Sequence, residues 1–134
     1  MNKLQGRIVH IESSQAMSIV EIDVQGDIFS AILLETPDSA AYLRPGNTVA
    51  LLFKETEVSV AKNLSGLISI RNRVKSSIKK IESNDILTKI ILDYQGQPIV
   101  SIISTKSARR LELKENDVIE WLVKTNEISL CATI

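Results

Sequence analysis

The chain has 134 residues, which is enough for one ordinary domain or for two very small ones. Lysine and arginine together number 16, as do aspartate and glutamate, so the formal net charge is zero and the fold presents no overall field to polyanions such as DNA. The amino-terminal residues include no apolar segment of the signal-peptide kind, and no apolar run approaches membrane-spanning length. We therefore expect a cytoplasmic protein that has no membrane partner and does not bind nucleic acid in bulk.

The first half of the chain predicts five short strands, because its apolar residues mostly recur at alternate positions. A hairpin is expected at Gln25-Gly26-Asp27, where Gly26 can supply a positive φ. A short helical piece fits Pro37–Leu43, with Thr36 as its N-cap. The predicted strands cover residues 4–11, 19–24, 28–34, 49–53 and 57–61.

The second half repeats this order and indicates a duplication. An ungapped offset of 70 pairs Asn2 with Asn72, and it pairs the letters I-E-S at residues 11–13 with the same letters at 81–83. We infer two domains, residues 1–64 and 65–134, joined near residues 63–66. Five strands with a small helix between the third and fourth are typical of an OB-like barrel, so the predicted class is all-β. The strands of the second half are expected at residues 74–81, 87–94, 99–104, 118–123 and 127–133, with a helical turn at 106–111.

The residue types argue against an enzyme. His10 is the only histidine, and it stands on the first predicted strand without the setting of a catalytic triad. The motifs of zinc proteases, thiol redox proteins, Walker loops and dinucleotide sites are all missing from the sequence. Cys131 is the only cysteine, so it cannot form a disulfide within the chain, and we expect it to be a small buried residue of the last strand.

Four basic residues, Arg71, Arg73, Lys75 and Lys79, fall on one face of an extended segment. They could contact phosphates, or they could guard an edge strand against pairing with other chains, which is the interpretation we favour for the last three. An OB fold that binds single-stranded nucleic acid would also need aromatic side chains interleaved with this ladder, and the sequence has none there. We therefore expect no nucleic-acid partner.

Other hydrogen-bond donors in the second half suggest that Arg71 has a different role from the three basic residues that follow it. Ser104 and Ser107 lie where the third predicted strand of the second half meets its helix, so their hydroxyls and the free N–H groups of the helix start should point outward together. Lys124 ends the fourth strand and is followed by Thr125. Donors of this kind, without a carboxylate, suit a tetrahedral dianion. On residue types alone, a plain helix cap and a strand-end lysine are the simpler explanation.

Three segments together resemble a known family. They are S-I-R-N at residues 69–72, S-T-K-S-A-R-R-L-E-L at residues 104–113, and L-V-K-T ending at Thr125. In this combination they resemble the molybdate-binding Mop family, whose domains are of the TOBE type and whose opening motif is S-A-R-N, with Ile70 here in place of the alanine. The tandem arrangement resembles the di-Mop proteins over essentially the whole chain. The resemblance implies two tandem OB-like barrels of five strands, each with one short helix.

The resemblance also implies a function. It predicts a non-enzymatic cytoplasmic store that binds molybdate, or tungstate, at interfaces between units, without an organic cofactor. The expected assembly is a homo-oligomer, with a trimer favoured, in which strands are exchanged between barrels. An alternative of another class is a molybdate-sensing module that acts on a partner transcription regulator or transporter ATPase. The implied ligands are Ser69, Arg71, Asn72, Ser104, Ser107, Lys124 and Thr125.

The first half departs from this pattern. At the offset of 70, Met1 stands in the place of Arg71, and Glu55 stands in the place of Thr125 with a carboxylate that would repel an oxyanion. Lys54 remains as a candidate ligand there. We expect the first half to serve as a scaffold or to complete a site on a neighbouring second half.

Overall fold

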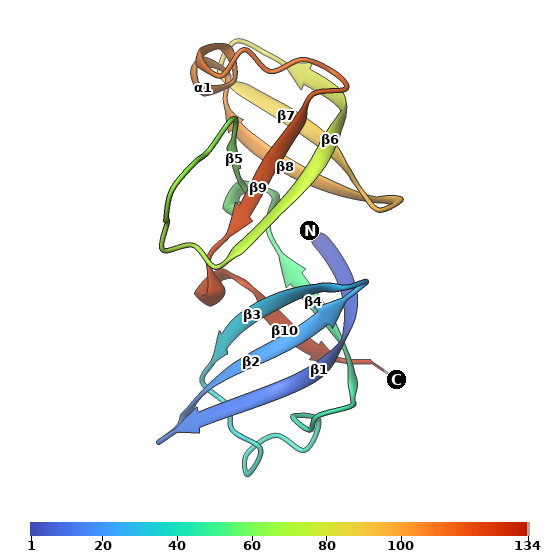
Figure 1. Cartoon of the computed structure of the whole chain (residues 1–134), viewed down its shortest axis with the longest axis vertical. Coiled ribbons are helices and arrows are strands. Elements are labelled where there is room, and N and C mark those ends of the chain that lie inside the picture. Colours follow the sequence, from blue (N-terminus) through green and yellow to red (C-terminus); the bar gives the residue numbers. More distant parts are fainter. Residues whose placement is uncertain (134) are drawn as a thin grey trace.

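The computed structural model describes residues 1–133 and consists of two five-stranded antiparallel sheets that follow each other along the long axis of the molecule (Figure 1). The first sheet has the strand order β10-β4-β1-β2-β3, and the second has the order β5-β9-β6-β7-β8. The predicted all-β class is confirmed. The elements are β1 (Asn2–Ser14), β2 (Met17–Val24), β3 (Asp27–Leu33), β4 (Thr48–Phe53), η1 (Glu55–Glu57), β5 (Ser59–Ala61), β6 (Asn72–Ser83), β7 (Leu87–Tyr94), β8 (Gln97–Ser104), α1 (Thr105–Arg110), β9 (Val118–Val123), η2 (Thr125–Glu127) and β10 (Ser129–Ala132).

Tight two-residue turns join β2 to β3 and β7 to β8. Gln25 and Gly26 have φ values of 53° and 96°, and two consecutive positive φ angles are the mark of the type I′ turn that matches the twist of a hairpin. The Gly26 N–H donates to Asp23 Oδ1 at 2.9 Å, which closes the turn. The same turn recurs at residues 95–96, so the expected hairpins form in both halves.

The two sheets exchange their last strands. β5, which ends the first repeat, pairs with β9 of the second sheet, and Ser59 lies opposite Leu122. β10, which ends the second repeat, pairs with β4 of the first sheet, and Ser129 lies opposite Leu52. Both pairs are related by the offset of 70, so the exchange is reciprocal. Each sheet is therefore completed by a strand from the other half of the chain. The division of the sequence into residues 1–64 and 65–134 stays a prediction, and it concerns the repeat units and not the sheets.

One hydrophobic core runs through both sheets, with Trp121 at its centre. The Trp121 ring centroid lies 5.8 Å from that of Phe29, 5.9 Å from that of Phe53 and 5.5 Å from that of Tyr94. Phe29 and Phe53 belong to the first sheet, whereas Trp121 and Tyr94 belong to the second. Because offset-stacked and edge-to-face aromatic pairs add to the energy of burial, this cluster fastens the halves together.

Two local predictions are wrong. The segment expected to form a helix, residues 37–43, forms turns instead: the Thr36 carbonyl accepts the N–H groups of Ser39 and Ala40, and the Thr36 N–H donates to Ser39 Oγ. The helical ladder does not continue beyond this turn, because the N–H of Leu43 donates to the Ala40 carbonyl and that of Arg44 to the Tyr42 carbonyl. Cys131 is exposed, not buried. It lies on the edge strand β10, where alternation directs Leu130 toward the core.

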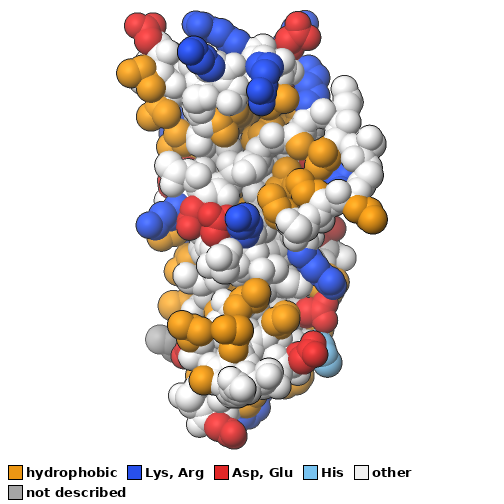
Figure 2. Space-filling view, turned by 90° about the vertical axis from the view of Figure 1, so that its left-hand side faces the viewer, with side chains coloured by type: hydrophobic (Ala, Val, Ile, Leu, Met, Phe, Trp, Pro, Cys, Tyr) orange, Lys and Arg blue, Asp and Glu red, His pale blue; other side chains and the backbone are white. Residues whose placement is uncertain are grey.

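Charge is distributed unevenly over the two halves. Residues 1–64 carry 5 basic and 8 acidic side chains, whereas residues 65–134 carry 11 basic and 8 acidic ones, so the formal charges are −3 and +3. On the face drawn in Figure 2, Lys and Arg side chains gather at the end of the molecule where α1 lies. The second half is therefore the more attractive to anions. Among residues 1–133, no helix has the length and apolar character needed to cross a membrane.

Candidate functional site

Two basic residues meet at the ends of neighbouring strands in the second sheet. β6 begins at Asn72 and β9 ends at Val123, and these two residues are partners in the antiparallel register. Arg71 immediately precedes this pair and Lys124 immediately follows it, so the register brings both exposed cations to one edge. We call this the second-half edge. Thr125 opens the 3₁₀ turn η2 beside Lys124 and is half-buried.

Ser69 belongs to the same neighbourhood. It is exposed in the loop that leads into β6, two residues before Arg71. The backbone of Lys124 is held by its own turn, because its N–H donates to Glu127 Oε1 at 3.3 Å and its carbonyl accepts the Glu127 N–H at 3.0 Å. The Lys124 ammonium stays at the surface. One chain thus places two cations and two hydroxyls around the second-half edge.

Arg71 also contacts an acidic residue of the other sheet. Its Nη2 lies 3.3 Å from Glu21 Oε2 on β2, and the Arg71 side chain is 64% exposed. Exposed ion pairs of this kind contribute about 0–1 kcal/mol, so the guanidinium can exchange this carboxylate for another anion at little cost. Glu21 was missed at the level of sequence because it belongs to the first half, and no local pattern connects it with Arg71.

The structure gives the Asn72 side chain a different task. It is 1% exposed, and its Oδ1 accepts the Ser30 N–H at 2.7 Å. Its Nδ2 donates to the carbonyl oxygens of Ser30 and Val123 at 2.9 and 3.0 Å. Both amide hydrogens are therefore engaged between β3 of the first sheet and β9 of the second. This leaves the side chain no donor for an oxyanion, and Asn72 joins the sheets.

Ser104 and Ser107 lie far from the second-half edge. The Ser104 Oγ caps α1 by accepting the Ser107 N–H at 3.1 Å, and it also contacts the Ser107 Oγ at 2.9 Å. Ser104 pairs with Leu87, which begins β7 beside the far end of β6. β6 has 12 residues, and a strand rises about 3.3 Å per residue, so its two ends lie up to roughly 36 Å apart. A single chain therefore does not bring these serines to Arg71.

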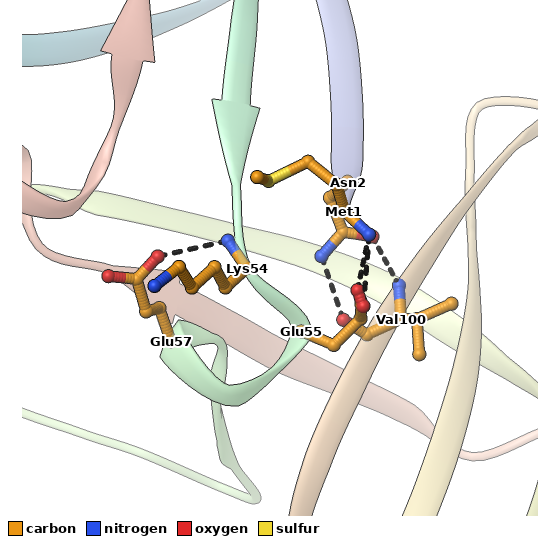
Figure 3. A network of polar contacts seen from close by, with 6 residues as sticks. All are labelled: Met1, Asn2, Lys54, Glu55, Glu57 and Val100. Carbon is orange, nitrogen blue, oxygen red and sulfur yellow. Dashed lines mark hydrogen bonds and ion pairs between the residues drawn. The ribbon is translucent and has the colours of Figure 1, made fainter.

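The first half contains a counterpart of this edge (Figure 3). Asn2 is the register partner of Phe53, so Met1 and Lys54 flank that pair as Arg71 and Lys124 flank theirs. We call this the first-half edge. Glu55 stands in the place of Thr125, and its Oε2 accepts from the Met1 nitrogen at 3.0 Å while its Oε1 contacts the same nitrogen. The lone cation predicted here, Lys54, is exposed and shares the edge with this carboxylate.

The Met1 contact governs the protonation of Glu55. The hydrogen bond from the Met1 nitrogen holds the pKa of the Glu55 carboxyl below its usual value, burial acts in the opposite direction, and the charge of Lys89 on β7 also lowers it. Glu55 is therefore an anion at neutral pH. In the described part of the chain, no group of His, Cys, Asp and Glu side chains is arranged to hold a metal ion.

Comparisons with known proteins agree with this fold. The family model of the TOBE domain matches residues 1–60 and again residues 68–130. The structure is similar to that of the cytoplasmic molybdate-binding protein ModG in a molybdate-bound form, with a TM-score of 0.91 and 24% identity over 98% of this chain and 96% of that one. That likeness confirms the predicted tandem OB-like fold. A comparison with curated protein sequences finds no significant match.

Two shorter proteins are similar to part of the chain. A molybdate-binding protein from Sporomusa ovata is 34% identical and covers 44% of this chain and 88% of its own length, with a TM-score of 0.43. MopII from Clostridium pasteurianum is 28% identical and covers 49% of this chain and all 100% of its own length, with a TM-score of 0.47.

Proposed function

We propose that this chain, which belongs to the TOBE-domain family and carries two copies of that domain, is a cytoplasmic protein that binds molybdate or tungstate reversibly and stores it. The proposal is one of binding without catalysis and without an organic cofactor. A protein of the same fold is described as a cytoplasmic molybdate-binding protein, which supports the choice of ligand and compartment.

The observation that carries the proposal is that Arg71 and Lys124 flank the register pair Asn72–Val123, at the start of β6 and the end of β9. Two positive charges on neighbouring strand ends can balance a dianion, and charge-assisted hydrogen bonds from them are about twice as strong as neutral ones. Ser69 and Thr125 add hydroxyl donors at the same edge. Glu21 would have to release Arg71 when the ligand binds, which an exposed single contact permits.

A complete site needs more than one copy of the chain if it uses every predicted ligand. Ser104 and Ser107 lie at the other end of β6 from Arg71, so they can reach a shared oxyanion only from a neighbouring copy. We therefore propose a homo-oligomer, with a trimer as the expected number, and with ligand bound at interfaces between units. Sedimentation analysis of the purified protein, which should give three times the mass of the chain, tests that number.

Calorimetric titration with molybdate, tungstate and sulfate tests the function. Saturable binding of the first two is expected, and its absence would overturn the proposal. Arg71→Ala removes a charge-assisted donor worth about 1.5–3 kcal/mol, so molybdate affinity should fall by about 10- to 150-fold. Arg7→Ala, which removes an exposed arginine from the first sheet, is the matched control and should leave the affinity unchanged.

A further inference from the structure

The first-half and second-half edges share one backbone frame but differ in two residues, because Met1 stands in the place of Arg71 and Glu55 in the place of Thr125. The pairs Asn2–Phe53 and Asn72–Val123 have the same register, and a lysine follows each of them. Both lysines are held by the same turn, because the N–H of Lys54 donates to Glu57 at 2.9 Å and the N–H of Lys124 donates to Glu127 at 3.3 Å. The next residue is a threonine in the second half and Glu55 in the first.

Glu55 places an acceptor where the second-half edge has a donor. Its carboxylate contacts the Met1 nitrogen through both oxygens, and its side chain is 26% exposed. Lys89 of the second sheet is near enough to favour the charged form, whereas the Lys54 side chain extends toward Glu57 (Figure 3). The carboxylate is therefore paired with the Met1 nitrogen and lies near one lysine. An ionised carboxylate has only acceptor sites, so it cannot bind an oxyanion and repels one electrostatically.

We propose that Glu55 is a built-in anion that fills the first-half edge, so that each chain takes up exchangeable molybdate at the second-half edge alone. This inference rests on the proposed function and adds which half performs it. The two halves then have different tasks: the second half holds the ligand, and the first half contributes a neutralised surface and strands to the fold.

The carboxylate near the second-half edge does not close that edge in the same way. Glu21 comes from β2 of the other sheet and meets Arg71 at 3.3 Å through one oxygen and one nitrogen, whereas Glu55 lies within its own edge and uses both oxygens. A single contact with a guanidinium that is 64% exposed can be exchanged for a contact with a dianion. The formal charge is −3 on the first half and +3 on the second, which also favours binding of the anion by the second half.

Equilibrium dialysis with molybdate tests the inference in four proteins of full length. Glu55→Thr removes the carboxylate and gives the first half the hydroxyl that the second half has, so the molybdate bound per chain at saturation should rise above that of the original chain. Glu115→Thr removes the same charge from an exposed turn and should leave the amount bound as in the original chain. The reciprocal change, Thr125→Glu, should abolish binding by closing the second-half edge.

The outcomes separate this inference from the function on which it rests. If the original chain binds no molybdate, the proposed function fails. If the original chain binds and Glu55→Thr, folded by circular dichroism, binds the same amount, the function stands and the inference is overturned. An equal rise in Glu115→Thr would also overturn it, because loss of any negative charge would then suffice. Should Glu55→Thr not fold, Glu55→Gln decides, because it removes the charge and keeps the shape of the side chain: unchanged binding in that variant overturns the inference, and increased binding supports it.

Discussion

At the scale of residues, the asparagine of the S-I-R-N segment and the arginine beside it have separate tasks. Asn2 bonds to Val100 through its Oδ1 and Nδ2, both at 2.8 Å, and Asn72 bonds in the same manner to Ser30, which is 70 positions before Val100. The two asparagines thus join the sheets at equivalent places. This shared structural role accounts for the asparagine in both halves, at Asn2 and Asn72. Arg71 does not have that role, and it occurs in the second half alone.

Replacing Asn72 with alanine should destabilise the ligand-free protein. The change leaves the Ser30 N–H and the Val123 carbonyl without their partner in a buried setting, and each unsatisfied group costs about 1–3 kcal/mol. We expect the free energy of unfolding in urea to fall by about 2–4 kcal/mol. Asn126→Ala, at an exposed position, should change it by less than about 0.5 kcal/mol. Equal effects of the two substitutions would contradict the assigned role of Asn72.

The ion pair of Arg73 and Glu120 should make stability depend on pH. Hydrogen bonds from Arg73, including one of 3.2 Å from Nη2 to Oε1, lower the pKa of the Glu120 carboxyl below its ordinary value. A lowered pKa in the folded state contributes stability above the unfolded pKa of about 4.3, and that contribution is lost as the pH falls through the folded pKa.

Glu120→Gln should therefore be less stable than the original chain near pH 7, and the difference should become smaller at about pH 2.5, below the unfolded pKa of about 4.3. Urea unfolding at the two pH values measures both differences, and Glu115→Gln at an exposed position serves as the control. A difference that persists undiminished in acid would show that packing, and not the charge of Glu120, is responsible.

At the scale of elements, alternation of apolar residues located the strands but could not pair them. The strands β7 and β9 lie where they were predicted, since their periodicity is clear and turns bound them. The exchange of β5 and β10 between sheets was suggested only by the family resemblance, because alternation fixes which side chains face a core and not which strand lies alongside. For the same reason the sequence could not show that Ser104 lies at the opposite end of β6 from Arg71.

Removal of β10 should damage the first sheet, to which it belongs in space. A chain that ends at Glu127 loses Ile128 and Leu130 from the core and exposes the edge of β4. We expect a lower melting temperature by circular dichroism and concentration-dependent light scattering, because open edges pair with other chains. A synthetic peptide of residues 128–133 should reverse both effects when added. A peptide of the same composition in scrambled order should not, and equal rescue by the two would contradict the strand-pairing account.

At the scale of the whole molecule, the two halves form one folding unit. The core is continuous, and Trp121 contacts aromatic rings of both sheets. Tyr94 of the second sheet reaches Asp27 of the first with its hydroxyl at 2.7 Å. Neither half has a complete sheet or a complete core by itself. If one half unfolded alone, the other would lose a strand and expose part of its apolar core to water.

Unfolding in urea should therefore be a single transition. Trp121 is the only tryptophan, so its fluorescence reports on the junction of the halves, while far-ultraviolet circular dichroism reports on all strands. We expect the two signals to give the same midpoint and slope, as two-state unfolding requires. Two resolved midpoints would mean that one half persists without the other.

The exchange of β10 has a consequence for synthesis on the ribosome. Leu52 of β4 leaves the ribosome long before its register partner Ser129 has been made. At roughly 5–20 residues per second, the interval lasts about 4–15 s. During this time the apolar strand β4, with the sequence T-V-A-L-L-F, has one unpaired edge. Other ribosomes on the same messenger RNA carry nascent chains with the same unpaired edge close by. Expression conditions that slow translation or crowd ribosomes should therefore lower the yield of folded protein.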